Sequence, residues 1–309
     1  MLNPKKSLGS QTFFLVFLIA LIGGGTGAFA KISLEEITPL SLGFLRFLLA
    51  AGIFLPLVIR KKVSWAKIKK LFPLSLLCSA NVIFYIFGVQ KTTATISQML
   101  YASSPLIIAL LSLVFLKEKL YLKRILGIIT GALGVALIIF LPLLNKSSIW
   151  NGDLFGNILI LIAILSFSFY VVLSKKLQGK FTPLELVVSF IFTTAIIQFL
   201  LLPFDFISQN YWWPNLTLNS ILGLLYLVVF ATAISYFLTQ YAIKISTPVI
   251  FSMTFYLQPI LGYLWASVLL GERITFEFII GALLAFIGVA LVTSFNKDKP
   301  KSGDSGLQT

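Results

Sequence analysis

The stretch SPLIIALLSLVFLKEKLYLKRILGIITGALGVALIIF (residues 104–140) decides the fold, because it returns at residues 258–294 as QPILGYLWASVLLGERITFEFIIGALLAFIGVALVTS. An offset of 154 residues aligns the proline, the glutamate and two glycines of the copies: Pro105 with Pro259, Glu118 with Glu272, Gly127 with Gly281 and Gly134 with Gly288. From the prolines onward, 11 of the 36 aligned pairs are identical. Shared membrane composition alone does not place Pro, Glu and Gly at matching positions, so the sequence predicts an internal duplication.

The composition indicates a membrane protein. The 309 residues are 58% hydrophobic and 11% charged, whereas soluble domains carry about 25% charged residues. Apolar runs of about 20 residues recur along the chain, and each can cross a hydrocarbon core about 30 Å thick. Such long runs favour helices over the short alternating strands of a β-barrel. We therefore predict an all-α membrane protein.

The apolar runs predict ten transmembrane helices, at residues 13–31, 39–59, 71–90, 95–116, 124–144, 154–174, 183–203, 218–241, 247–270 and 276–295. Each copy of the duplication contains five of them. The predicted domains are a cytoplasmic tail (1–12), a first five-helix repeat (13–144), a second five-helix repeat (153–295) and a cytoplasmic tail (296–309).

The basic residues predict the orientation. With the N-terminus inside, 19 Lys and Arg fall in inside segments and 4 in outside segments, and Arg46 lies within a span. This bias puts both termini in the cytoplasm. The net charge of +14 therefore reflects topology, and we expect no nucleic-acid partner. Five spans per copy make the copies inverted repeats, which many secondary transporters use. Thr38-Pro39-Leu40 also recurs as Thr182-Pro183-Leu184, at an offset of 144.

Candidate binding residues follow from polar groups and prolines within the spans. Pro105 and Pro259 lie about ten residues into equivalent spans, where a proline bends a helix. They mark either a central pathway or a structural kink. Arg46 is the basic residue well inside an apolar run, a costly position. Three roles fit it: binding an anionic group of a substrate, pairing with a carboxylate, or snorkelling into the bundle.

Uncharged polar and aromatic residues gather on the third, fourth, sixth, eighth and ninth spans. They suit a cavity for a small amphipathic solute, or hydrogen bonds between helices. The predicted substrate-binding residues are Arg46, Asn81, Tyr85, Gln98, Tyr101, Pro105, Tyr170, Tyr236, Gln240, Tyr256, Pro259 and Trp265.

A glycine pattern predicts close helix packing. Three glycines of the first copy share one helix face, and the second copy repeats that face with small residues: Gly127, Gly131 and Gly134, then Gly281, Ala285 and Gly288. Small residues let helix backbones approach in a bilayer. The pattern leaves open whether the contact joins the two halves or two protomers.

Motifs of catalysis are missing from the sequence. It contains no HExxH, Walker A sequence or nucleophile elbow, no histidine, and the single cysteine Cys78. We therefore expect no enzyme activity, no cofactor and no metal site. Without an ATP-binding segment, transport would draw on a gradient.

Several segments resemble the EamA-type members of the drug/metabolite transporter superfamily: GGGTGAFAK (residues 23–31), LRFLLA (residues 45–50), and the two copies running from Pro105 and Pro259 through Glu118 and Glu272 to a GVAL helix. The resemblance covers about residues 13–295. It implies a multi-pass protein of the bacterial inner (plasma) membrane that exports, or less often imports, small metabolites such as amino acids. It also implies a central cavity formed by spans one, three, four, six, eight and nine. One departure is Ile22, where a tryptophan commonly precedes the glycine.

The leading hypothesis is secondary transport by alternating access, with a small-molecule solute and the lipid bilayer as partners. A polytopic membrane enzyme acting on a lipid-linked substrate is the alternative, but it should carry clustered acidic or histidine residues, and the ten acidic residues here are scattered. A third hypothesis is a non-transporting assembly subunit. The solute, the direction, the coupling ion, and the choice between monomer and homo-oligomer stay open.

Overall fold

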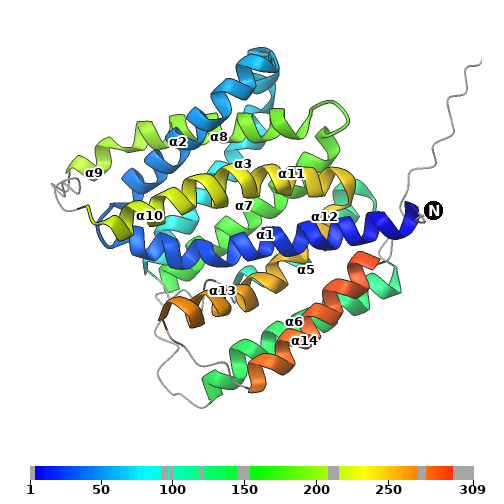
Figure 1. Ribbon diagram of the computed structural model, residues 1–309. Coiled ribbons are helices and arrows are strands. Elements are labelled where there is room, and N and C mark those ends of the chain that lie inside the picture. Colours follow the sequence, from blue (N-terminus) through cyan, green and yellow to red (C-terminus); the bar gives the residue numbers. More distant parts are fainter. Residues whose placement is uncertain are drawn as a thin grey trace, which may run out of the picture.

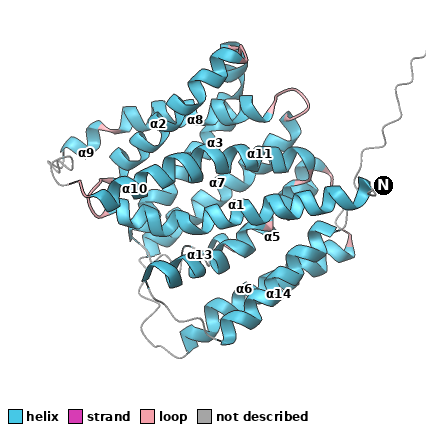
Figure 2. Ribbon diagram, in the orientation of Figure 1, coloured by secondary structure: helices cyan, strands magenta, loops and turns pink. Residues whose placement is uncertain are grey.

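The computed structural model describes residues 4–91, 97, 100–118, 121–144, 154–207, 216–270 and 276–294, and every element within them is a helix (Figures 1 and 2). The first half contains α1 (Pro4–Leu34), α2 (Pro39–Arg60), α3 (Trp65–Lys91), α5 (Ser104–Leu116) and α6 (Leu122–Leu144). The second half contains α7 (Leu154–Leu177), α8 (Pro183–Leu201), α9 (Pro203–Ile207), α10 (Leu218–Tyr226), the π-helical η2 (Leu227–Ile234), α11 (Ser235–Ile245), α12 (Pro248–Ser252), α13 (Thr254–Leu270) and α14 (Phe276–Ser294).

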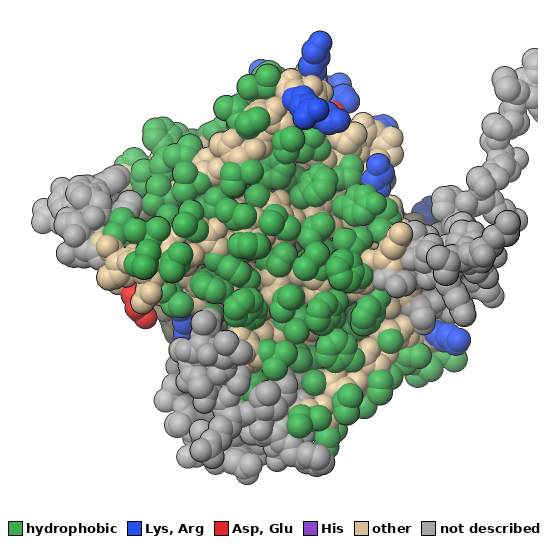
Figure 3. Space-filling model, viewed as in Figure 1, with side chains coloured by type: hydrophobic (Ala, Val, Ile, Leu, Met, Phe, Trp, Pro, Cys, Tyr) green, Lys and Arg blue, Asp and Glu red, His purple; other side chains and the backbone are tan. Residues whose placement is uncertain are grey.

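Six helical stretches of the described chain are long and apolar enough to cross a bilayer: Gln11–Leu34, Pro39–Arg60, Trp65–Lys91, Leu154–Leu177, Pro183–Asp205 and Leu218–Ile245. Ser104–Leu116 and Ile279–Thr293 are shorter apolar helices. Large apolar side chains cover the outside of the bundle, and Lys and Arg gather at the margins of the face in Figure 3. The protein is therefore a multi-pass, all-α membrane protein, as the composition predicts.

The two halves interleave instead of forming separate domains. The main packing partners come from opposite halves: α1 packs on α13, α3 on α7 and α8, α2 on α8, and α6 on α14. The α6–α14 pair lies along one edge of the bundle (Figure 1). Because each half covers apolar faces of the other, the chain has a shared interior, and a site between the halves is built by both.

The predicted glycine faces meet each other in the α6–α14 pair, which we call the glycine seam (Gly127, Gly131, Gly134, Gly281, Ala285 and Gly288). A Cβ atom on Gly127 would lie 2.8 Å from the carbonyl oxygen of Gly288, and one on Gly134 would lie 2.6 Å from that of Gly281. Gly288 is the counterpart of Gly134, and Gly281 that of Gly127, so the contacts are reciprocal and the helices antiparallel. Of the two alternatives, the contact between halves is the one observed.

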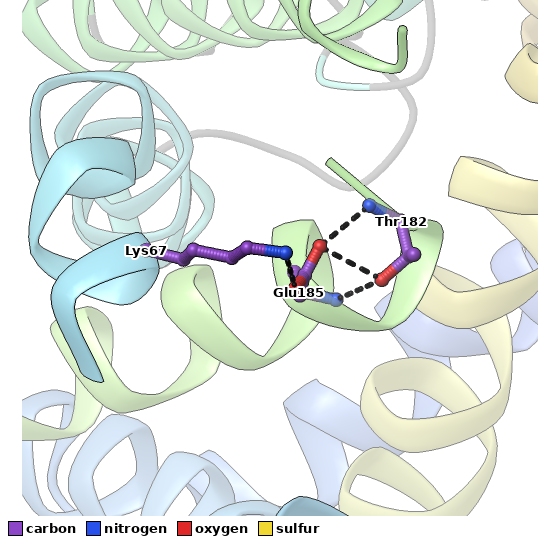
Figure 4. A network of polar contacts seen from close by, with 3 residues as sticks. All are labelled: Lys67, Thr182 and Glu185. Carbon is purple, nitrogen blue, oxygen red and sulfur yellow. Dashed lines mark hydrogen bonds and ion pairs between the residues drawn. The ribbon is translucent and has the colours of Figure 1, made fainter. Parts of the chain in front are cut away.

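Thr-Pro pairs start α2 and α8, but their anionic partners differ. In α8, Thr182 Oγ1 accepts from the Glu185 backbone N–H at 3.2 Å, and Glu185 Oε2 accepts from the Thr182 backbone N–H at 2.8 Å. Figure 4 shows this capping box, with Lys67 of the other half 2.8 Å from Glu185 Oε1. In α2, Asp205 of the other half accepts from the Ser41 N–H at 2.8 Å, and also from the Thr38 hydroxyl.

Another polar contact joins the halves at a loop. Glu36, in the turn between α1 and α2, accepts a hydrogen bond from the Thr217 backbone N–H at 2.8 Å. This bond, with a second from the Ser220 side chain, lowers the pKa of the Glu36 carboxyl. The turn after α1 is thus held at the start of α10.

The two equivalent prolines occupy different positions. Pro259 lies inside α13, which begins at Thr254, in agreement with a proline in a helix interior. That prediction is wrong for Pro105, which sits in the first turn of α5 after a turn at residues 102–103. A proline lacks the N–H that a first turn leaves unbonded anyway, so it favours a helix start there over a kink.

Candidate functional site

A cavity of about 120 Å³ lies between the two halves. It is large enough for several water molecules or a small organic solute. Its lining comes from α1, α2, α3, Tyr101 ahead of α5, α7, η2, α11, α12 and α13. These elements correspond to the spans that the family resemblance implies, with Arg46 of α2 in addition.

Arg46 is the charged residue of the described lining. It exposes 7% of its surface. Its Nε donates to Thr232 Oγ1 at 2.5 Å, and its Nη2 donates to the Ala231 carbonyl at 3.3 Å. Among the described residues no carboxylate lies within 4.0 Å of the guanidinium. A guanidinium carries five N–H donors, so donors remain beyond these two bonds.

The π-helical turn η2 positions the partner of Arg46. Thr232 Oγ1 donates to the carbonyl of Leu227, five residues earlier, at 2.7 Å. Its proton is therefore directed into the helix, and a lone pair is left for the Arg46 Nε–H. Widened turns of this kind often occur at functional sites. Here the wide turn brings a hydroxyl and the Ala231 carbonyl to one guanidinium.

Polar residues of α3, together with Tyr101 ahead of α5, form another wall. Asn81 Nδ2 donates to Tyr101 Oη at 2.7 Å and to the Ala163 carbonyl at 2.9 Å. The ring of Tyr85 meets that of Tyr101 edge-on, with centroids 5.6 Å apart. Because Tyr101 Oη accepts from Asn81, its own proton is available for donation to a group in the cavity.

Phenylalanines form the apolar wall. Phe255 of α13 meets Phe167 edge-on at 5.9 Å and Phe251 at 6.0 Å between ring centroids. All three line the cavity. The site thus offers a cationic corner, neutral hydrogen-bonding groups and an aromatic surface, which suits a small molecule with an anionic group and an apolar part.

Glycines of α1 bring this helix close to α13 beside the cavity. A Cβ atom on Gly23 would lie 2.3 Å from Gln258 Nε2, and one on Gly24 would lie 2.7 Å from the backbone nitrogen of Gly262. Gln258 also lines the cavity. The glycines therefore have two effects: they let α1 and α13 pack closely, and they leave room for the Gln258 side chain in the cavity.

The structure brings together part of the predicted binding set. Five of the predicted residues line the cavity: Arg46, Asn81, Tyr85, Tyr101 and Tyr236. Gln98 lies outside the described residues. The remaining six are not among the residues that line it: Pro105, Tyr170, Gln240, Tyr256, Pro259 and Trp265.

Four of those six have clear packing or hydrogen-bonding partners elsewhere. Gln240 of α11 donates to Ser174 Oγ of α7 at 3.3 Å and accepts from Gln178 Nε2, in the turn after α7, at 2.9 Å.

Tyr170 packs between Phe167 and Phe190, with ring centroids 6.0 Å from each. Tyr256 is buried against Gly131 of α6. Trp265 Nε1 donates to the Leu21 carbonyl at 3.1 Å.

Some lining residues are absent from the predicted set. Ser235 and Gln258 are polar residues of the predicted cavity spans, so composition points to them. Thr26 and Thr239 line the cavity as well, but threonines are ordinary in membrane helices. The phenylalanines of the wall carry no distinguishing feature among the 29 of the sequence.

An all-helical membrane bundle whose two halves enclose one amphipathic cavity has the architecture of a solute transporter. The model of the EamA-like transporter family matches residues 11–140 and again residues 154–294. The chain therefore belongs to the EamA-like transporter family, and the two matches agree with the duplication.

Individual relatives carry consistent names. An uncharacterized transporter of Archaeoglobus fulgidus is 27% identical over 292 residues, which cover 93% of this chain and 99% of the relative. A probable amino-acid metabolite efflux pump of Salmonella typhimurium is 30% identical, over 89% of this chain and 92% of the relative. A chain of known crystal structure shares the fold with a TM-score of 0.73 and 18% identity, over 92% of this chain and 97% of that chain. The protein is a membrane transporter.

Proposed function

We propose that the protein is a secondary transporter that exports a small carboxylate-bearing metabolite, such as an amino acid, by alternating access. In this proposal ten transmembrane helices form two inverted five-helix repeats. Both termini lie in the cytoplasm, and the membrane is the bacterial plasma membrane. The cavity between the halves is the solute site, and Arg46 holds the carboxylate.

The observation that carries the proposal is the buried guanidinium. Arg46 is held by two neutral acceptors, and the described lining contains no carboxylate to balance its charge. A buried charge without a counter-ion is costly. A carboxylate from the solute would accept from the remaining N–H donors in the two-pronged geometry that suits arginine.

The other walls fit the rest of such a solute. The Tyr101 hydroxyl can donate to a hydroxyl group of the solute, and neutral oxygens of the polar lining can accept from an ammonium. Phe167, Phe251 and Phe255 cover an apolar side chain. A cavity of about 120 Å³ limits the solute to a small metabolite.

The inverted arrangement has two independent supports. In the glycine seam, equivalent helices of the two halves run antiparallel, as inverted repeats require. The distribution of 24 Lys and Arg favours cytoplasmic termini and an even number of spans. The name of the Salmonella relative supports amino-acid metabolites as the solute class and export as the direction.

Counterflow in proteoliposomes tests the proposal. Vesicles that contain the purified protein are loaded with an unlabelled amino acid, and entry of the labelled form is followed for a panel of amino acids and their carboxamides. We expect saturable exchange of at least one amino acid and little exchange of its carboxamide. If folded, monodisperse protein moves none of the panel, or moves carboxamides equally well, the carboxylate proposal fails.

A further inference from the structure

One lysine ties two helices together at one end of the bundle. Lys175, in the last turn of α7, donates from Nζ to the carbonyls of Ile243 at 2.8 Å, Lys244 at 3.2 Å and Ser246 at 2.6 Å. These carbonyls end α11, where the last turn of a helix lacks backbone partners. The ammonium thus caps α11 in a favourable position for a cation.

The duplication supplies a counterpart for each side of this contact. At the offset of 144 that aligns the Thr-Pro-Leu segments, Lys175 corresponds to Lys31, in the last turn of α1. At the offset of 154, the end of α11 corresponds to the end of α3, where Ile243 and Lys244 match Val89 and Gln90. By inverted symmetry, Lys31 would cap α3 at the opposite end of the bundle.

The two counterparts differ in this structure. Lys175 makes three hydrogen bonds, and α7 packs against α11 at that end. Lys31 is exposed, and its side chain has no hydrogen bond or ion pair with any described residue. All four of these helices, α1, α3, α7 and α11, contribute residues to the cavity lining. The contact is therefore made at one end and open at the other.

We propose that Lys175 is a latch that closes one end of the cavity, and that Lys31 is the matching latch of the other end, used in alternation. The proposal rests on the alternating access proposed above. In this structure the Lys175 latch, at the cytoplasmic end in the proposed orientation, is engaged, and the Lys31 latch is not. When the halves rock, Lys175 releases α11, and Lys31 reaches the carbonyls at the end of α3.

The symmetry of the latches has an energetic consequence. Each state gains one ammonium bound to the terminal carbonyls of a helix and leaves the other ammonium exposed. Each state therefore has one capping lysine and one exposed lysine, which keeps the free energies of the two states close. Transporters need this balance, because a solute shifts an equilibrium only by its differential affinity for the two states.

Thiol labelling in sealed vesicles tests the latch without any solute. Cys78 is first changed to Ser, and Thr239, which lines the cavity one helical turn before Ile243, is changed to Cys. An impermeant maleimide is then applied to right-side-out and to inside-out vesicles. The test variant is Lys175→Met, the matched control is Lys176→Met at an exposed neighbour, and Lys175→Arg restores the donors.

We expect Lys175→Met to raise the labelling rate from the cytoplasmic side about tenfold, the effect of losing hydrogen bonds from a charged group. Lys176→Met and Lys175→Arg should stay close to the parent rate. Lys31→Met should shift labelling the opposite way, because it weakens the state in which the Lys175 end is open. Equal rates for Lys175→Met and Lys176→Met in protein with an unchanged melting temperature would overturn the latch, as would shifts of Lys175→Met and Lys31→Met in one direction.

The same variants separate the latch from the transport proposal. Labelling that shifts as expected in a protein that moves no solute supports a two-state bundle and rejects the proposed transport. Counterflow with unshifted labelling supports transport and rejects the latch.

Discussion

The glycine seam and the cavity have diverged differently since the duplication. In the seam, equivalent residues make reciprocal contacts, so that Gly127 faces Gly288 as Gly281 faces Gly134. In the cavity, the offset of 144 pairs Arg46 with Phe190, an apolar residue in the middle of an aromatic cluster. One region keeps the two-fold symmetry, and the other has lost it.

Different physical demands explain the contrast. The seam joins a helix to its own counterpart, so a residue that fits on one side also fits on the other. The cavity faces one molecule at a time, and a solute with one anionic group needs one guanidinium. A second buried arginine at position 190 would double the desolvation cost without a second counter-ion.

The largest effect is expected in the seam. An alanine Cβ at position 134 would lie 2.5 Å from the backbone nitrogen of Ala285 and 2.6 Å from the carbonyl oxygen of Gly281. Backbone atoms cannot rotate away, so we expect Gly134→Ala to lower the free energy of unfolding by about 2–3 kcal/mol. Unfolding in mixed detergent micelles measures this loss.

Two further variants decide whether the loss follows from the seam's symmetry. Gly288→Ala should cost about as much as Gly134→Ala, because the contacts are reciprocal. Gly52→Ala is the matched control, since nothing lies within 4 Å of the added atom; it should be neutral or stabilising by up to about 1 kcal/mol. A large difference between positions 134 and 288 would show that the seam is not symmetric in energy.

The second effect concerns the asymmetric charge of the cavity. We expect Arg46→Gln to lower counterflow of a carboxylate solute about 30-fold or more, because removal of one partner from a buried charge pair is costly. Arg46→Lys should retain part of the activity, since it keeps the charge and loses the two-pronged geometry. Arg60→Gln, at the exposed end of the same helix, is the control and should leave counterflow unchanged. Equal losses at both positions would remove Arg46 from the solute pathway.

The sequence predicts the symmetric part of the molecule better than the asymmetric part. The duplication, the glycine faces and the interior position of Arg46 follow from spacing and composition. The cavity wall depends on which helix face turns inward, and consecutive residues differ by about 100° around a helix. Thr239 of α11 lines the cavity, whereas its neighbour Gln240 donates a hydrogen bond to Ser174 of α7. The uniformly apolar spans give little indication of that direction.

The wide turn η2 is a second reason for the difference. A π-helical stretch changes the direction of every later side chain in its helix. Nothing in the sequence LVVFATAI distinguishes it from a regular apolar helix. Its effect on Thr232 and Ala231, the acceptors of Arg46, therefore emerges only from the structure.

A smaller effect is expected from the acceptor itself. Thr232→Val keeps the shape of the side chain and removes the oxygen that accepts from Arg46 Nε. We expect counterflow to fall about fivefold, the size of one net hydrogen bond, with the apparent affinity for solute reduced and the melting temperature nearly unchanged. Thr239 lines the same cavity without a bond to Arg46, so Thr239→Val is the control. If Thr239→Val lowered counterflow as much as Thr232→Val, the bond from Arg46 to Thr232 would have no special importance among the polar lining residues.

The smallest effect is expected at the start of α8, which has the same Thr-Pro sequence as the start of α2 but a different anionic partner. The Lys67 side chain is 48% exposed, and an exposed ion pair contributes little, so Lys67→Met should lower the free energy of unfolding by less than about 0.5 kcal/mol. Glu185→Ala removes the capping box as well and should cost about 1 kcal/mol or more. If the two variants lost equal free energy of unfolding in micelles, the ion pair with Lys67 of the other half would be the contact that stabilises the start of α8. Asp205 stabilises the start of α2 in the same way, so the two helix starts would then be more symmetric than their hydrogen bonds indicate.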